Sequence, residues 1–193
     1  FLTSAAFTKL KHVIQGAGKK TTARNAWQVV ANIIWAVTSS VLFLFTHNEI
    51  FILFFIAFVA AVTADTWASE IGPLLNKRCF SLAKMKTVTA GVNGGISFFG
   101  SLAALTGATV VAALSYYVFF GFWHWDIIAL LSISAFMACF VDSLLGAFLE
   151  DKIFQMNFFK KPKTIESITP NDLVNMMGSV TAFVFYIVLS WIF

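Results

Sequence analysis

The chain has 193 residues, of which 59% are hydrophobic and only 11% are charged. A soluble globular domain carries about 25% charged residues, so this composition excludes a soluble domain and indicates a protein embedded in a lipid bilayer. The formal net charge is +4. Its distribution matters more than its sum, because basic residues set membrane orientation. The two cysteines stand far apart, one in a basic segment and one in an apolar run, so no disulfide framework is implied.

The first segment, residues 8–26, is polar and basic, and it contains two glycines that oppose a helix. It lacks the spacing of a phosphate-binding P-loop, so a basic loop beside the membrane is the better interpretation. The sequence opens on Phe1 in a short apolar fragment. We therefore expect a truncated or processed N-terminus, from which one or more helices are missing.

Five apolar segments follow, each about 20 residues long, which is the length needed to cross roughly 30 Å of hydrocarbon. Backbone polar groups in lipid must be satisfied within each segment, so the predicted fold is all-α, a polytopic bundle of transmembrane helices in a single domain. Pro73 is expected to end the second span, and residues 91–97 are interpreted as a turn or broken helix before the third. The spans are predicted at residues 27–46, 50–69, 98–120, 127–149 and 172–193.

The basic residues divide unequally between the two sides of these spans. All 13 Lys and Arg residues lie in three segments that alternate to the same side, residues 8–26, 73–90 and 150–170. The short connections at residues 47–49 and 121–126 contain none. By the positive-inside rule the basic side is cytoplasmic, or its organellar equivalent, and the C-terminus lies on the opposite face.

The second span ends in residues 65–72, with the sequence D-T-W-A-S-E-I-G. A carboxylate within the hydrocarbon costs about 3 kcal/mol on insertion scales, so Asp65 and Glu70 indicate a site. The alternative is that they pair with Lys or Arg to fix the topology. The two acids diverge by about 140° around a helix, so both reach one metal ion only if the helix frays at its end. Ser69 shares a helix face with Asp65 and is a candidate binding residue.

Asp142 lies in the fourth span, roughly two turns from its basic-side end. A buried carboxylate needs a metal, a cation or a proton, so its candidate roles are metal ligand and general base, with a hydrogen bond across the bundle as the alternative. Mg²⁺ is commonly held by one or two carboxylates together with substrate phosphates, and we predict Mg²⁺ at Asp65, Glu70 and Asp142. Asn32 in the first span is better explained by a hydrogen bond between helices.

The glycine-rich segment contains Asn93, Gly94, Gly95 and Ser97. Backbone N–H groups with little side-chain obstruction at the start of a helix suit an anion, because the helix N-terminus carries partial positive charge. Close packing of helices through small residues is the competing explanation for the glycines. Packing alone does not require Asn93.

The fifth span begins with Asn171, Asp172 and Asn175. An N-terminal cap explains either of the first two, but it does not explain Asn175. Lys84 and Lys86 are candidate contacts for nucleotide phosphates, although basic residues in such loops also contact anionic lipid. Polar groups from four places in the sequence therefore converge on the basic side of the membrane.

This combination of polar groups and apolar spans suits phosphate chemistry on a lipid-soluble substrate, in which positioning and charge neutralisation do most of the work. A transporter would also place acids and Asn in its spans and stays open as an alternative, but it would favour a site near the bilayer midplane with access from both faces, whereas the polar residues here cluster at one face. A structural subunit would leave Asp142 unexplained. No nucleic-acid partner is expected.

The chain resembles the integral-membrane family of transmembrane protein 19 and the phytyl-phosphate kinase of tocopherol synthesis, in order over nearly its whole length. The motifs that carry the resemblance are D-T-W-A-S-E-I-G at 65–72, G-V-N-G-G-I-S at 91–97, D-S-L-L-G at 142–146 and N-D-L-V-N at 171–175. Val92 stands where the family often has Thr, and the further N-terminal hydrophobic sequence usual in the family is absent here.

The resemblance implies a membrane kinase that converts a phytyl or polyprenyl monophosphate to the diphosphate, with CTP or another nucleoside triphosphate as donor. A lipid-phosphate cytidylyltransferase would use the same Mg²⁺, CTP and lipid groove, and it stays open as an alternative. We expect the three acids to bind Mg²⁺ and handle protons, the glycine-rich segment to bind phosphate, and the start of the fifth span to complete a polar rim. The active site is expected at the cytoplasmic face.

Overall fold

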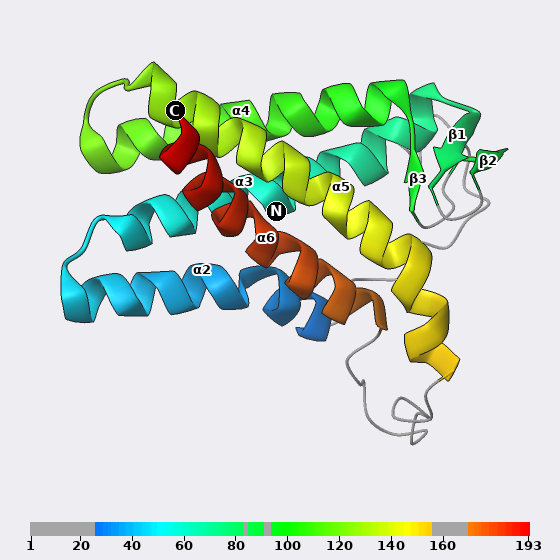
Figure 1. The fold of residues 1–193 in the computed structure, drawn as a ribbon, viewed down its shortest axis with the longest axis horizontal. Helices are drawn as coiled ribbons and strands as arrows, with labels where there is room; N and C mark the ends of the chain where they lie inside the picture. Colours follow the sequence, from blue (N-terminus) through cyan, green and yellow to red (C-terminus); the bar gives the residue numbers. More distant parts are fainter. Residues whose placement is uncertain (1–25, 83–84, 91–93, 156–169) are drawn as a thin grey trace.

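The computed structural model describes residues 26–82, 85–90, 94–155 and 170–193 of the chain. Within these residues, five long helices account for most of the structure (Figure 1). All five are long and apolar enough to cross a membrane, which confirms the expected all-α bundle of transmembrane helices. The helices are α2 Ala26–Thr46, α3 Ile50–Leu75, α4 Phe98–Phe120, α5 Trp125–Gln155 and α6 Pro170–Ile192.

The connections between helices alternate between the two ends of the bundle. Residues 47–49 and 121–124 lie at one end, which we call the bare end, and a small sheet lies at the other (Figure 1). Lys77, Arg78 and Lys86 belong to the sheet end, which we call the basic end. The alternation of helices therefore places these basic residues on one side, as the charge pattern predicts.

Helix α3 is the centre of the bundle because it packs against each of the other four helices. Its contact with α4 depends on small residues: Gly72 faces Gly100, and an added Cβ on Gly107 would lie 3.0 Å from Cδ2 of Trp67. Small residues let helix backbones approach closely in lipid, where van der Waals contact drives association. The buried alanines of the two helices are Ala57, Ala60, Ala61, Ala64, Ala103, Ala104, Ala108 and Ala112.

Pro73 does not end α3, so this expectation was wrong. The helix continues to Leu75 with Pro73 inside its last turn. A proline so close to a helix C-terminus removes only one backbone hydrogen bond. In addition, the backbone N–H and the side-chain amide of Asn76 both donate to the Gly72 carbonyl oxygen, at 3.0 and 3.2 Å. The last turn is therefore held closed.

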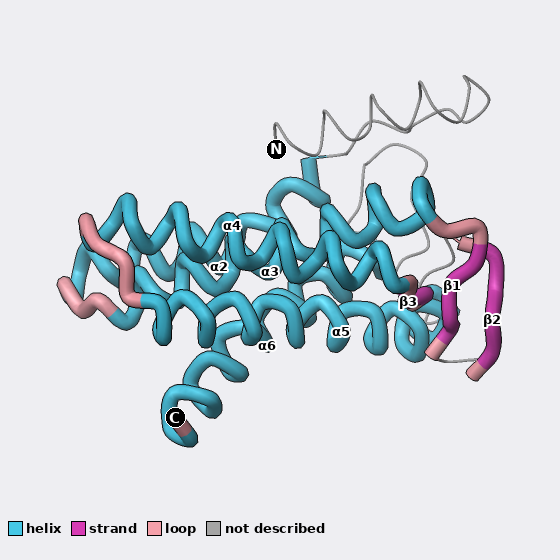
Figure 2. The backbone as a smooth tube through the Cα atoms, turned by 90° about the horizontal axis from the view of Figure 1, so that it is seen from above, coloured by secondary structure: helices cyan, strands magenta, loops and turns pink. Residues whose placement is uncertain are grey.

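A three-stranded antiparallel sheet connects α3 to α4, and nothing in the sequence pattern indicated it. Strand β1 Arg78–Ser81 is central, with β2 Lys86–Thr89 on one side and β3 Gly95–Ile96 on the other. The register pairs Phe80 of β1 with Thr87 of β2 and with Ile96 of β3. The strands cross the end of the bundle instead of continuing along the helices (Figure 2).

The sheet changes the interpretation of the glycine-rich segment. Gly94 lies in a turn with φ +68°, and Gly95 belongs to β3. Helix α4 begins only at Phe98, where the Ser97 hydroxyl oxygen accepts a hydrogen bond from the Gly100 N–H at 3.2 Å. The turn at Gly94 agrees with the interpretation of residues 91–97 as a turn before the third span, whereas the two glycines do not lie at the start of a helix, because Gly95 belongs to β3 and α4 begins at Phe98.

The contact between Trp67 and Gly107 predicts that a larger side chain at position 107 of α4 destabilises the protein. Replacing Gly107 with Leu should lower the unfolding free energy by about 1–3 kcal/mol, because the new side chain overlaps the indole ring. Thermal unfolding of the protein in detergent measures this loss. Thr106→Leu is the matched control, since Thr106 is exposed on the same helix. Equal unfolding temperatures for the two variants would contradict the described contact.

Candidate functional site

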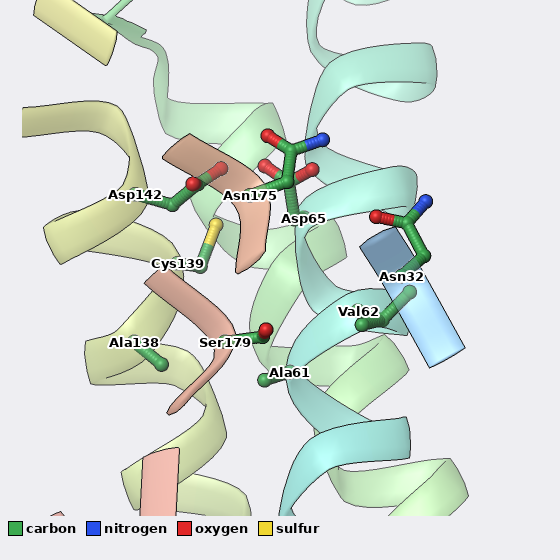
Figure 3. A pocket seen from close by; sticks show the side chains of 9 residues that line it. All are labelled: Asn32, Ala61, Val62, Asp65, Ala138, Cys139, Asp142, Asn175 and Ser179. Carbon is green, nitrogen blue, oxygen red and sulfur yellow. The ribbon is translucent and has the colours of Figure 1, made fainter. Parts of the chain in front are cut away.

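Polar side chains from four helices line a pocket between α2, α3, α5 and α6 (Figure 3). The cavity has a volume of about 20 Å³, and a polar cavity larger than about 10–15 Å³ admits a water molecule. Three apolar residues, Ala61, Val62 and Ala138, complete its wall. The polar residues are Asn32, Asp65, Cys139, Asp142, Asn175 and Ser179.

The polar residues lie at a common depth in the bundle. At 1.5 Å per residue, Asn32, Asp65, Asp142 and Asn175 are each about 21–26 Å from the bare ends of their helices. The hydrocarbon layer is about 30 Å thick, so the pocket lies in the basic-end half of the membrane. The structure thus brings together Asp65, Asp142 and Asn175 of the predicted site residues.

Aromatic rings of α2, α3 and α6 lie on the bare-end side of the pocket. Phe54 lies between Phe58 and Phe183, with ring centroids 4.4 and 3.8 Å away, and Trp35 stacks on Phe58 at 6.1 Å. These four residues, which we call the aromatic layer, lie one to two helical turns beyond the pocket-lining residues of α2, α3 and α6. The Trp35 indole N–H donates to the Met176 carbonyl oxygen at 2.9 Å and ties α2 to α6 beside the pocket. Packed aromatic side chains therefore lie between the level of the pocket and the bare end.

The side chain of Asp142 packs directly against α6. An added Cβ on Gly178 would lie 2.5 Å from Oδ1 and 2.8 Å from Cβ of Asp142, closer than non-bonded atoms approach. Oδ1 of Asp142 is shielded from solvent, and so is Oδ1 of Asp172 in the first turn of α6. Only a glycine at position 178 leaves room for the carboxylate in this position.

The turn at Gly94 rests on α5 on the basic-end side of Asp142. An added Cβ on Gly94 would overlap Cβ of Ala147 and lie 2.7 Å from the Ser143 carbonyl oxygen. Ser143 follows Asp142 in the chain, and Ala147 lies one turn further toward the basic end. The positive φ and the close approach both require glycine here. Two of the sequence motifs, G-V-N-G-G-I-S and D-S-L-L-G, therefore contact each other.

Glu70 and Ser69 do not line the pocket. Ser69 is exposed, and its hydroxyl donates to the Thr66 carbonyl oxygen at 3.0 Å. Because α3 does not fray at its end, Glu70 keeps its different direction around the helix from Asp65. In the described part of the chain no group of three or more His, Cys, Asp or Glu residues is arranged to hold a metal ion, so the expected set of three carboxylates is not assembled.

The remaining predicted residues take other positions. Ser97 caps α4, Gly95 pairs with Ser81 in the sheet, and Lys86 is exposed on β2. Asn93 and Lys84 lie outside the described residues, and so does the side chain of Asn171. Their proposed contacts with phosphate stay predictions.

Cys139 and Ser179 line the pocket and were not predicted as site residues. The signal for them was present, because Cys139 lies three residues before Asp142 and Ser179 lies four residues after Asn175. Residues with these spacings share a helix face. Asn32, interpreted from the sequence as a contact between helices, also lines the pocket.

Comparison with known proteins identifies the family. A model of the integral membrane protein family DUF92 matches residues 1–183. The chain belongs to this family. The match agrees with the resemblance recognised in the sequence motifs.

Three curated relatives are similar over part of their length. Uncharacterized membrane protein MJ0933 of Methanocaldococcus jannaschii is 30% identical over 68% of this chain and 53% of its own length. Uncharacterized membrane protein sll0875 of Synechocystis is 31% identical over 51% of the chain and 37% of its length. Protein PGR of Arabidopsis thaliana is 28% identical over 62% of the chain and 46% of its length. The chain spans about half the length of these relatives or less, and no solved structure matches it.

The packing of Asp142 on Gly178 predicts different effects for two helical glycines. Gly178→Ala should destabilise the protein by about 1–3 kcal/mol because the added methyl group collides with the carboxylate. Gly146→Ala should be neutral or slightly stabilising, because its added Cβ has its nearest neighbours at 3.9 and 4.0 Å. Unfolding temperatures in detergent test the pair, and a more damaging Gly146→Ala would overturn the described position of Asp142.

Proposed function

We propose that this protein is part of a membrane kinase that transfers a phosphoryl group from a nucleoside triphosphate, with CTP favoured, to an isoprenoid monophosphate. The observation that carries the proposal is the meeting of two carboxylates, Asp65 of α3 and Asp142 of α5, in a polar pocket inside the basic-end half of a transmembrane bundle. Charged groups at such a depth are costly and are usually functional. Membership of the family and the resemblance of the motifs support the same reaction class.

The donor set of the pocket fits Mg²⁺. Two carboxylates, the amide oxygens of Asn32 and Asn175 and the hydroxyl of Ser179 are hard oxygen ligands, and Mg²⁺ is commonly held by one or two carboxylates with its other positions left for water and phosphate. We assign Asp65 and Asp142 as the residues that would hold it. When bound, Mg²⁺ neutralises charge on phosphate oxygens.

The size of the pocket determines where the substrates would lie. A cavity of about 20 Å³ holds a group the size of a water molecule but not a phosphate. We therefore place the reacting phosphates at the basic-end mouth of the pocket, beside the turn at Gly94. The isoprenoid chain would lie in the surrounding lipid.

The reaction itself requires little proton transfer. An oxygen of the isoprenoid monophosphate attacks the γ-phosphorus of the donor, the bond from that phosphorus to the β,γ-bridging oxygen breaks, and the nucleoside diphosphate leaves. A phosphate monoester has its second pKa near 6, so the attacking oxygen is largely deprotonated at pH 7. Asp65 and Asp142 would therefore act primarily as metal ligands, because the reaction needs no strong general base.

The aromatic layer favours an enzyme over a transporter. A transporter needs access to its site from both faces of the membrane. In this bundle the rings of Trp35, Phe54, Phe58 and Phe183 pack together between the pocket and the bare end. The pocket is placed for substrates that approach from the basic end.

Substitution of the two carboxylates tests the proposal. The purified full-length protein would be incubated with geranylgeranyl monophosphate, Mg²⁺ and γ-labelled CTP, and label in the isoprenoid diphosphate would be measured. Asp65→Asn and Asp142→Asn should each lower kcat about 100-fold or more, because loss of a charged metal ligand costs several kcal/mol of transition-state stabilisation. Glu70→Gln should have a smaller effect.

Asp126→Asn is the matched control for this assay, because Asp126 is exposed at the bare end, at the start of α5. It should leave the rate unchanged. Entry of an α-labelled nucleotide into lipid, with no γ-label transferred, would replace the kinase with a cytidylyltransferase. An equal loss of kcat in the Asp126→Asn variant would show that the two pocket carboxylates have no specific role in the reaction.

A further inference from the structure

The sheet at the basic end exposes both apolar and basic side chains. Along β1 burial alternates, with Cys79 and Ser81 buried against the protein and Arg78 and Phe80 exposed. Their partners on β2, Thr89 and Thr87, are exposed as well. The sheet therefore has one face directed away from the bundle, and that face combines a cation with an aromatic ring.

Further exposed side chains near this face are also apolar or basic. Met85, in the turn before β2, is 73% exposed and Phe80 is 42% exposed. Lys77, which precedes β1, and Lys86, which pairs with Ser81 on the edge strand β2, are exposed at the borders of the sheet, although the register does not place them on the same face as Arg78 and Phe80. We call this group the hairpin surface, made of Lys77, Arg78, Phe80, Met85 and Lys86.

The helix ends place the hairpin surface in the headgroup region of the bilayer. Phe98, the first residue of α4, is 73% exposed, which indicates that the hydrocarbon reaches this level. From there α4 extends for about 34 Å, enough to cross roughly 30 Å of hydrocarbon. The sheet directly precedes Phe98 and lies across the end of the helices (Figure 2). It is thus beside lipid headgroups and not deep in the cytoplasm.

The charge of the segment identifies the kind of partner. Between Glu70 and Asp126 the sequence contains no Asp or Glu, while it contains four Lys and Arg residues. We propose that the hairpin surface binds anionic phospholipid headgroups, with Lys77, Arg78 and Lys86 at the phosphates and Phe80 and Met85 in contact with the interfacial region. Basic residues near a membrane surface attract anionic lipid, and exposed apolar side chains such as Phe gain from contact with the boundary between headgroups and acyl chains.

This binding would also influence the site. Strand β1 is hydrogen-bonded to β3, and β3 directly follows the turn at Gly94 that rests on α5 above Asp142. A hairpin held at the membrane surface therefore fixes the strand that positions this turn. The inference that lipid binds the hairpin surface does not depend on the proposed kinase reaction.

A fluorescent label on the hairpin tests the inference. Met85→Cys would be labelled with an environment-sensitive dye in full-length protein that carries Cys79→Ala and Cys139→Ala, then reconstituted in vesicles of phosphatidylcholine alone or with about 30% phosphatidylglycerol. Lipids with a spin label near the headgroup should quench the dye at least about twofold more strongly when the anionic lipid is present, and salt should reduce the difference.

Matched variants test whether the positive charge of the hairpin surface causes the stronger quenching in vesicles that contain anionic lipid. Replacing Lys77, Arg78 and Lys86 with Gln should abolish the effect of phosphatidylglycerol, whereas Thr87→Gln with Thr89→Gln should preserve it. A label at position 124, placed by His124→Cys at the bare end, should not respond to lipid charge. If the cysteine-free background does not fold, phosphatidylglycerol retained on the unlabelled protein after purification gives the same comparison between the charge variant and the parent.

Two results would overturn the inference. Quenching that does not depend on lipid charge would show that the exposed cations contact no headgroups. A change in the fluorescence of the label on addition of CTP in detergent, without response to phosphatidylglycerol in vesicles, would assign the surface to nucleotide phosphates.

Discussion

The cost of holding the carboxylates of Asp65 and Asp142 within transmembrane helices is the constraint on which the rest of this structure depends. An acid in the hydrocarbon must face the interior of a bundle. Helix α3 meets this requirement from the centre, because small residues let α4 approach it closely and leave its other side to α2, α5 and α6. Gly178 does the same for Asp142 by giving the carboxylate room against α6. Small residues in this bundle thus determine where the charged ones point.

The parts of the fold that were predictable from sequence are those set by the bilayer. A hydrocarbon layer of about 30 Å fixes span length, and the one-sided distribution of Lys and Arg fixes which helix ends lie together. These two rules place Asp65, Asp142 and Asn175 on one side before any contact is known. The sheet was missed because its strands are of two to four residues, too short for an alternating pattern to stand out.

The candidate site was predictable only where a residue's direction follows from helix geometry. Asp65 and Glu70 diverge around α3, and the expectation that they share a metal required a frayed helix end. Hydrogen bonds from Asn76 to the Gly72 carbonyl oxygen keep that end closed in spite of Pro73. Such capping bonds depend on the path of the chain after the helix, which the sequence pattern does not contain. Cys139 was overlooked for a different reason, because a cysteine in an apolar run looks like any other small core residue.

The aromatic layer has an electrical consequence. A membrane potential falls mainly across low-dielectric material, and the packed rings of Trp35, Phe54, Phe58 and Phe183 lie between the pocket and the bare end. Moving one charge through the whole potential costs about 2.3 kcal/mol per 100 mV. Charges that enter the pocket from the basic end cross little of that drop. The rate of chemistry in the pocket would thus depend only weakly on the membrane potential.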